Sequence, residues 1–288
     1  MMNAQAIAKM RVASPKGTRR FAHVSDLHLG RAPKDEVRAI QLCRALVGLG
    51  VDHVVVTGDI THRGHRRELA LFERAFAPLL EAGEVTMVPG NHDRLGDDLG
   101  DRLMPGPRVQ TELADGLYIV RVNSTGPHNR SWIAGHGALE PEDIDAIDDV
   151  LDAAPAGHLT VIALHHHVVP LPDEHAVERL STFLGWPFTS ELARGHELLA
   201  RVRGRCSVVL HGHRHVPRGV QIGDHRGVVQ VYNAGSSTGL GAFRVFEHAG
   251  GALVGEPWWL QATPGAAPSA VAPEDFTAEP APIAIAAT

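Results

Sequence analysis

Short apolar runs alternate with longer amphipathic segments through the first third of the chain. Residues 21–25, 54–56 and 84–88 are apolar and rich in β-branched side chains, which is typical of buried strands. Between them, residues 35–49 and 65–82 carry apolar side chains at close to helical spacing. This strand–helix–strand–helix–strand order predicts an α/β fold built from parallel β-α-β units with right-handed crossovers.

The same pattern continues and then changes. Residues 117–122, 159–164 and 207–210 read as further strands, and residues 140–153 and 189–203 as helices. After residue 215, short apolar segments separated by turn residues are typical of an antiparallel meander, so the second half is expected to add its own sheet. These short strands are predicted at residues 219–222, 227–232, 242–246 and 252–257.

The two ends of the chain differ in composition from the rest. Residues 1–19 are expected to form a flexible arm, and residues 262–288 an Ala/Pro-rich disordered tail. The 288 residues are 44% hydrophobic, and a single domain over residues 20–261 is the simplest organisation. No apolar run resembles a signal peptide or approaches the length of a membrane span.

Net charge and cysteine content limit which binding partners and which cellular compartment are expected. The net charge is −6 and no dense basic run occurs, so a nucleic-acid partner is not expected. The two cysteines, Cys43 and Cys206, lie in apolar patterns and are expected to be small buried hydrophobes. A cytoplasmic, reduced location follows from these features, and a homodimer is left open.

Five polar fragments occur in a fixed order, most of them directly after an apolar run. Because strand ends of an α/β protein meet at one edge, their side chains are expected to gather there. Oxygen and imidazole ligands without thiolates suit Mn, Fe or Zn, and there are enough of them to hold two ions. Such a site indicates two-metal hydrolysis of a phosphate ester. The fragments are Asp26-Leu27-His28, Gly58-Asp59, Gly90-Asn91-His92-Asp93, His165-His166-His167 and Gly212-His213-Arg214-His215.

Spacing within the fragments indicates which side chains act together. Asp59 follows a glycine that lets backbone approach closely, and is the natural carboxylate to bridge two ions. Asp26 and His28 alternate around one residue, so an extended segment would put both on one face. The same reasoning predicts that His213 and His215 face one way.

The remaining fragments supply further ligands and a candidate acid. Asn91 offers a neutral oxygen, which limits the negative charge of the site. His92 is then not needed as a metal ligand, and a free imidazole at this position suits protonation of the leaving alkoxide. Of the three consecutive histidines one ligand is expected: His165, which comes first after the strand, with His166 as its competitor.

This series of motifs resembles the calcineurin-like metallophosphoesterase superfamily over residues 21 to about 247. The resemblance implies a four-layer α/β/β/α sandwich with two mixed sheets and a dimetal site at the strand ends. It implies His92 as the leaving-group acid. It also implies two ligand sets: Asp26, His28, Asp59 and His215 for one metal, and Asp59, Asn91, His165 and His213 for the other.

Within the superfamily, the stretch LHHHVVP at residues 164–170 resembles bacterial class III cyclic-nucleotide phosphodiesterases. That resemblance implies hydrolysis of 3′,5′-cAMP or related small phosphodiesters, commonly with Fe or Mn. The alternative is a metallophosphatase or phosphodiesterase acting on a phosphoprotein, a nucleotide-linked lipid precursor or a glycerophosphodiester. A non-catalytic scaffold would be expected to have lost Asp59 or His92, and both are present.

Three segments are expected to rim the metals: residues 124–138, 170–188 and 233–238. Phe183 and Trp186 could stack on a base or pack the second segment onto the body, and this segment is a candidate lid. Other candidates are phosphate-contacting arginines and histidines that orient ligands, namely Arg63, Arg94, Arg214, His62 and His65.

Overall fold

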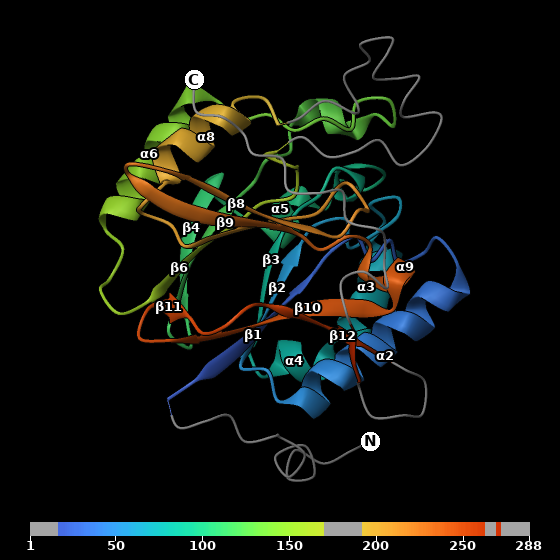
Figure 1. The fold of residues 1–288 in the computed structure, drawn as a ribbon. Helices are drawn as coiled ribbons and strands as arrows, with labels where there is room; N and C mark the ends of the chain where they lie inside the picture. Colours follow the sequence, from blue (N-terminus) through green and yellow to red (C-terminus); the bar gives the residue numbers. More distant parts are fainter. Residues whose placement is uncertain (1–16, 170–191, 263–268, 272–288) are drawn as a thin grey trace.

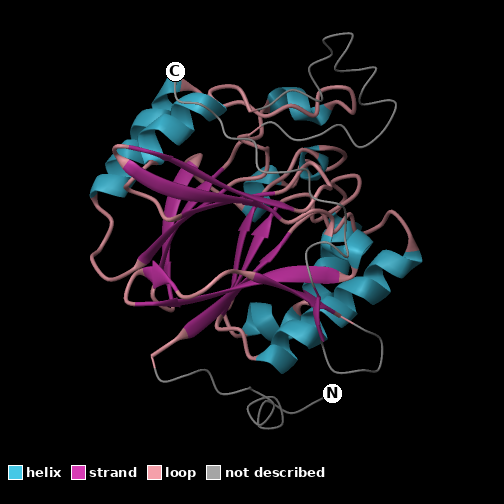
Figure 2. Cartoon of the chain, in the orientation of Figure 1, coloured by secondary structure: helices cyan, strands magenta, loops and turns pink. Residues whose placement is uncertain are grey.

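Two β-sheets lie face to face, and each is covered on its outer side by helices (Figures 1 and 2). The structure is a computed structural model that describes residues 17–169, 192–262 and 269–271. One sheet is covered by α2 (Pro33–Leu49), α3 (Arg66–Ala75) and α4 (Ala77–Glu81), and the other by α6 (Pro141–Asp152) and α8 (Gly195–Val202). The predicted four-layer α/β/β/α sandwich is confirmed.

The first sheet is mixed. Its strands run in the order β13-β12-β10-β1-β2-β3, with β11 paired to β10. The neighbours β1, β2 and β3 are parallel, as the β-α-β units predict, and the other pairs are antiparallel. The strands are β1 (Arg19–Val24), β2 (His53–Thr57), β3 (Val85–Val88), β10 (Ala242–Ala249), β11 (Ala252–Leu253), β12 (Trp258–Gln261) and β13 (Ser269–Val271).

The second sheet is also mixed, in the order β4-β5-β6-β7-β9-β8. Strands β5, β6, β7 and β9 are parallel, and β4 and β8 are antiparallel at the two edges. The strands are β4 (Val109–Ala114), β5 (Leu117–Val122), β6 (Leu159–Ala163), β7 (Val208–His211), β8 (Arg218–Asp224) and β9 (Gly227–Asn233). Short helical turns fill the connections: η1 (His92–Arg94), α5 (Gly100–Leu103), η2 (Pro127–Arg130) and α9 (Ser237–Leu240).

Alternation along the strands explains how one chain fills the spaces between four layers. In β2, Val54 and Val56 face the helices while Val55 lies in the cluster between the sheets. In β6, Ile162 faces the other helix layer while Val161 lies between the sheets. Successive side chains of a strand point to opposite faces, so a strand covered on both sides is apolar throughout.

The predicted helix over residues 65–82 is instead two helices. The chain leaves α3 at Phe76, which has φ −103° and ψ 10°, and α4 begins at the next residue. Pro78 has no backbone N–H to donate to the carbonyl of Arg74 four residues earlier, so a continuous helix would lose a hydrogen bond there.

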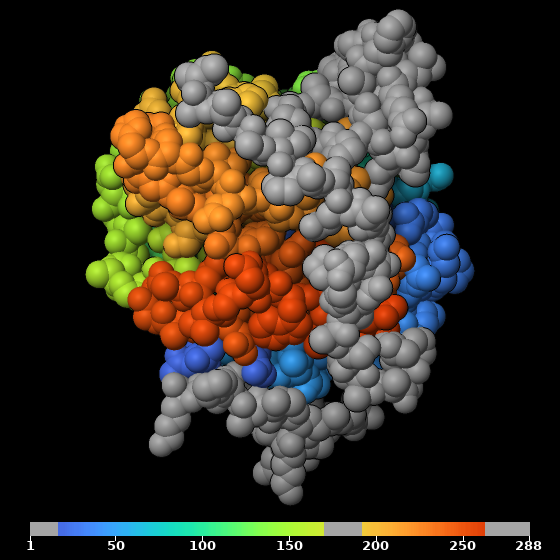
Figure 3. Space-filling view, viewed as in Figure 1, coloured from blue at the N-terminus to red at the C-terminus, as the bar shows by residue number. Residues whose placement is uncertain are grey.

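The predicted antiparallel meander after residue 215 holds only in part: β10 pairs antiparallel with β11 and β12, but β9 and β10 lie in different sheets. Strands β8 and β9 form an antiparallel pair, but β9 also pairs with β7, and β10 crosses to the first sheet and pairs with β1. On the face seen in Figure 3, the red C-terminal segments accordingly lie between the orange segments and the blue N-terminal ones. In β10, Phe243 and Val245 face helices and Phe246 faces the other sheet, so the strand requires cover on both sides.

Three further strands were not predicted. One is β12, because the strand predicted over residues 252–257 covers only β11, and β12 begins after it. Strand β4 is an edge strand with partly exposed side chains, and its polar sequence VQTELA therefore lacks an apolar run. Strand β13 lies within the segment predicted to be a disordered tail and pairs antiparallel with β12, so that prediction does not hold for residues 269–271. Most of the predicted arm, residues 1–16, lies outside the described residues.

The cysteine prediction is confirmed: Cys43 and Cys206 are buried and unpaired, one in each helix-facing cluster. Burial raises the pKa of each thiol to about 12. Among the described helices, none combines the length and apolar character needed to cross a membrane.

Candidate dimetal active site

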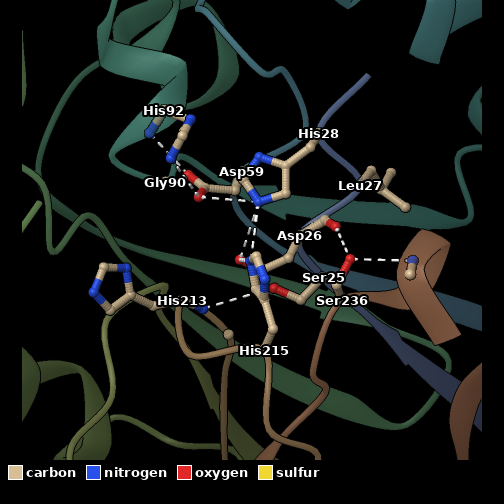
Figure 4. Close-up of polar contacts among 12 residues, drawn as sticks. Ser25, Asp26, Leu27, His28, Asp59, Gly90, His92, His213, His215 and Ser236 are labelled. Carbon is tan, nitrogen blue, oxygen red and sulfur yellow. Dashed lines mark hydrogen bonds and ion pairs between the residues drawn. The ribbon is translucent and has the colours of Figure 1, made fainter. Parts of the chain in front are cut away.

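The loops that follow β1, β2, β3, β6 and β7 meet at one edge of the two sheets, as the strand directions predict. Figure 4 shows side chains from several of these loops pointing toward one another around Asp26 and Asp59. All seven candidate ligands lie in this cluster: Asp26, His28, Asp59, Asn91, His165, His213 and His215.

One half of the cluster consists of Asp26, His28 and His215. The Nε2 atoms of the two imidazoles lie 3.1 Å apart. Asp26 Oδ1 lies 3.5 Å from His215 Nε2 and 3.9 Å from His28 Nε2. These three ligand-type atoms are close enough to surround one ion.

The other half consists of Asn91, His165 and His213. Asn91 Oδ1 lies 3.0 Å from His165 Nε2 and 3.0 Å from His213 Nδ1. His165 Nδ1 lies 2.8 Å from the Thr57 carbonyl, to which only a protonated Nδ1 can donate, so Nε2 faces the site.

Asp59 lies between the two halves. Its Oδ1 is 3.4 Å from His165 Nε2, while its Oδ2 is 3.7 Å from His28 Nε2. The two oxygens of one carboxylate thus face different sets of nitrogen donors. This is the arrangement expected of a carboxylate that bridges two cations.

The donor set fits metal ions and is hard to explain without them. Asp26 is fully buried, and its Oδ1 has no hydrogen-bond partner. An unpaired buried carboxylate oxygen is costly unless a cation compensates it. Carboxylate, amide and imidazole groups without thiolate suit Mn, Fe or Zn.

The pKa values of the histidines are shifted in different directions because their surroundings differ. Burial lowers the pKa of His28 and of His213 well below the usual value, which leaves their nitrogen lone pairs available. Burial would also lower the pKa of His165, but the Asp59 carboxylate outweighs it and raises that pKa to about 9. In turn, His165 and His92 hold the pKa of Asp59 well below its usual range despite burial.

Backbone strain concentrates at this site. Seven non-glycine residues in the described part of the chain have positive φ, and four of them are candidate ligands: Asp26 (52°), His28 (46°), Asp59 (49°) and His213 (71°). Such conformations cost about 1–3 kcal/mol each and persist at functional sites. The expectation of an extended Asp26–His28 segment is therefore wrong: left-handed turns, and not strand alternation, aim these side chains inward.

Asp93 and Glu68, to which the sequence analysis assigned no role, fix the loops that carry the ligands. Buried Asp93 accepts hydrogen bonds from Thr61 N (2.9 Å) and Gly90 N (2.9 Å), so it ties the loop after β2 to the loop after β3. Glu68 of α3 accepts from Arg63 N at 2.7 Å. An acidic residue directly after the Asn-His pair, inside one of the five fragments, was the available signal for Asp93.

Gly90 is required by close approach. A Cβ atom at this position would lie 2.2 Å from Asp59 Oδ1. We expect Gly90→Ala to displace the carboxylate and lower metal affinity by about 10- to 100-fold, measured as metal content after dialysis against a chelator. Gly48→Ala in α2, where a Cβ meets nothing within 4 Å, is the control and should keep full metal content. Equal metal retention in both variants would contradict this account.

His92 stands at the rim of the cluster with one nitrogen engaged and the other directed inward. Its Nδ1 lies 2.8 Å from the His62 carbonyl, and its Nε2 lies 3.9 Å from Asp59 Oδ2. The His62 ring stacks on the His92 ring with centroids 5.6 Å apart. His62 thus orients His92, although His28, His62 and His92 also lie close enough together to be a ligand group on geometry alone.

The two competing histidines differ in what their ring nitrogens contact, although His165, His166 and His213 also lie close enough together to be a ligand group on geometry alone. His166 Nδ1 lies 2.8 Å from Ser124 Oγ and its Nε2 lies 2.9 Å from the Gly135 carbonyl, so both ring nitrogens are engaged outside the cluster. His165 directs its Nε2 toward Asn91 and Asp59.

Other candidates from the sequence are placed elsewhere. Arg94 is buried and pairs with Asp98, and His65 Nδ1 lies 3.7 Å from Asp97, so neither points into the cluster. Residues 233–238 do not rim the site. Their buried side chains support the loop after β1 from behind: Ser236 Oγ donates to the Asp26 carbonyl at 2.8 Å.

The other two segments expected to rim the metals are residues 170–188 and 124–138. Residues 170–188, with Phe183 and Trp186, lie outside the described residues. Residues 124–138 do reach the site, and their Trp132 stands against His92, with ring centroids 5.1 Å apart at 90°. No sequence pattern indicated the place of this indole, because loop residues have no periodicity that reveals their neighbours.

Comparison with known proteins identifies the class. Residues 19–217 match the family described as calcineurin-like phosphoesterase, and this chain therefore belongs to that family. Membership places it among the metal-dependent phosphoric ester hydrolases.

Related sequences and structures agree with this class. A protein of Rhodococcus erythropolis named a probable cyclic nucleotide phosphodiesterase is 27% identical over 181 residues, which span 57% of each chain. A protein of Psychrobacter arcticus with the same name is 27% identical over 253 residues, 78% of this chain and 82% of that one.

Two solved structures share the fold. A dimetal phosphatase from Danio rerio has a TM-score of 0.55 at 16% identity, covering 84% of this chain and 94% of that chain. A purple acid phosphatase from yellow lupin seeds has a TM-score of 0.58 at 12% identity, covering 88% of this chain and 53% of that chain.

Proposed function

We propose that the protein hydrolyses small phosphodiesters, with 3′,5′-cyclic nucleotides such as cAMP as its substrates. The observation that carries the hydrolytic part is the position of Asp59, whose two oxygens face two separate groups of donors. The cyclic-nucleotide part is supported by the names of the relatives from Rhodococcus erythropolis and Psychrobacter arcticus.

In this proposal Asp59 is shared between two metal ions, Mn or Fe, with Zn as an alternative. Asp26, His28 and His215 complete the donors of one ion, and Asn91, His165 and His213 those of the other. When bound, the ions would neutralise phosphate oxygens and make a nucleophile available at neutral pH.

His92 is the proposed leaving-group acid. Its Nδ1 is held by the His62 carbonyl, so the protonated ring presents Nε2–H toward the space beside Asp59. As the P–O bond breaks, this proton passes to the departing oxygen, which leaves as an alcohol instead of an alkoxide. The partly exposed edge of the ring admits a substrate.

A substrate panel on Mn-loaded protein tests the proposal. It compares bis-p-nitrophenyl phosphate, p-nitrophenyl phosphate, 3′,5′-cAMP, 2′,3′-cAMP and a phosphopeptide. We expect turnover of the diester and of cyclic nucleotides, with little on the monoester or the peptide. Monoester or phosphopeptide turnover without cyclic-nucleotide turnover would overturn the substrate assignment and favour a metallophosphatase.

Paired substitutions test the ligand role of His165. His165→Ala should lower metal content from two ions toward one per chain and strongly reduce turnover. His166→Ala should keep two ions and instead cost about 1–3 kcal/mol of stability, because it leaves the buried partners of this ring unsatisfied. Metal analysis and thermal unfolding measure both effects. The reverse pattern of metal content would make His166 the ligand.

A further inference from the structure

A cavity of about 440 Å³ lies beside the site on the His92 side. Its volume is in the range of pockets that hold small organic ligands. None of the residues that line it is among the candidate metal ligands. The lining consists of Arg63, His65, Leu95, Gly96, Arg130 and Trp132.

Trp132 joins this cavity to the proposed acid. Its ring lies perpendicular to His92 at 5.1 Å between centroids, and it also meets the ring of His62 at 5.7 Å. The side chain is nevertheless 57% exposed. A large part of the indole is therefore uncovered next to the imidazole ring from which a leaving group would take its proton.

Arg63 provides a second recognition element in the same cavity. It is exposed, and no described residue forms an ion pair with its guanidinium. The cavity's other arginine, Arg130, is already paired with Asp98 at 2.7 Å. Arg63 is thus the cation that can donate to a ligand without breaking an existing ion pair.

We propose that this cavity is a leaving-group subsite that binds the aromatic base of a nucleotide. The base stacks on Trp132, and Arg63 donates to acceptor atoms on the edge of the base. This inference rests on the proposed function, because it takes His92 as the proton donor. A leaving oxygen must lie near His92 Nε2, so the sugar and base attached to it extend toward Trp132.

Trp132 and Arg63 would recognise the base in different ways, the first by stacking and the second by hydrogen bonding. Base–aromatic stacking tolerates every base because each has a π face. Arginine donors match the N7 and O6 acceptors of guanine in a two-pronged geometry. Trp132 therefore sets the requirement for a base, and Arg63 favours guanine among the bases.

The kinetic test compares 3′,5′-cAMP with the corresponding cyclic ribose phosphate that lacks a base. Trp132→Ala should lower kcat/KM for cAMP by about 10- to 100-fold and leave the abasic substrate unchanged. Trp132→Phe should retain most of the cAMP activity because it keeps a flat ring. Ile133→Ala is the matched control. Ile133 is next to Trp132 in the sequence, its side chain is 77% exposed, and it does not line the cavity. This variant should behave as wild type.

The binding test needs neither metal nor turnover. Adenosine titrated into metal-free protein should quench tryptophan fluorescence, and Trp132→Phe should abolish that quenching. Ribose should give no change in either protein. Arg63→Ala should weaken the affinity for guanosine more than that for cytidine.

The outcomes separate the subsite from the proposed function. If wild-type protein hydrolyses bis-p-nitrophenyl phosphate but no cyclic nucleotide, the proposed substrate fails while the adenosine titration still decides on the subsite. If cAMP is hydrolysed and Trp132→Ala matches wild type on both substrates, the subsite is wrong. A Trp132→Ala defect that is equal on both substrates and accompanies a change in oligomeric state would also overturn it, assigning this face to contacts between copies.

Discussion

Asp59→Ala is expected to lose both metal ions and to reduce kcat/KM for any phosphodiester by about 10³-fold or more. The loss is large because one carboxylate faces both halves of the cluster, with its oxygens 3.4 Å from His165 Nε2 and 3.7 Å from His28 Nε2. Removing it leaves Asp26 as the remaining carboxylate among the candidate ligands, so two bound cations would repel each other without an anion shared between them. Metal content after gel filtration and steady-state kinetics with added Mn measure the effect.

Two further variants show whether the effect is specific. In the wild type, His92 N donates to Asp59 Oδ1 at 2.9 Å. Asp59→Asn keeps an oxygen that can accept this hydrogen bond but removes the negative charge. We expect this variant to be nearly as defective as Asp59→Ala. Asp101→Ala removes a carboxylate that is 93% exposed and should retain metal and activity. Two tightly held ions in Asp59→Ala would exclude the bridging role.

His92→Ala should keep both metal ions and lose turnover in a way that depends on the leaving group. For 3′,5′-cAMP, whose ribose oxygen departs as a poor leaving group, we expect a loss of about 10²–10⁴-fold. For bis-p-nitrophenyl phosphate the loss should be less than about tenfold, because p-nitrophenolate leaves without needing a proton. The ratio of the two effects is the diagnostic quantity.

A metal measurement could contradict the role of His92 as the leaving-group acid. The ring nitrogens of His28, His62 and His92 lie close enough together to hold one metal ion. If removal of His92 released metal, His92 would be a ligand. Metal analysis of His92→Ala distinguishes the two roles directly. His158→Ala changes a half-buried histidine that lies just before β6, at the opposite end of this strand from His165. It is the control and should alter neither metal content nor the turnover of either substrate.

Much of the fold could be predicted because burial on both faces leaves a local trace. Strands such as β2 and β6 are continuous apolar runs, and each meets a polar fragment where it ends. The direction of parallel strands then places those fragments at one edge. The sandwich followed from the family resemblance, and the three hydrophobic clusters bear it out.

The errors occurred where structure depends on contacts between segments distant in sequence. Strand β10 looks like the next strand of a meander, yet it pairs with β1, more than 200 residues earlier. Edge strand β4 has no apolar face that a pattern could reveal. The break between α3 and α4 was readable in principle, since Pro78 lies inside the predicted helix.

The sequence by itself determined the chemical types of the site: two aspartates, an asparagine and a set of histidines, most of them placed directly after strands. These features are local, because residue type and strand periodicity are properties of short segments. Only the tertiary structure decided that Asp59 divides its oxygens between two donor groups, that His166 is engaged elsewhere, and that Trp132 stands against His92. Those relations join loops separated by tens of residues, and their geometry is set by how the two sheets close upon each other.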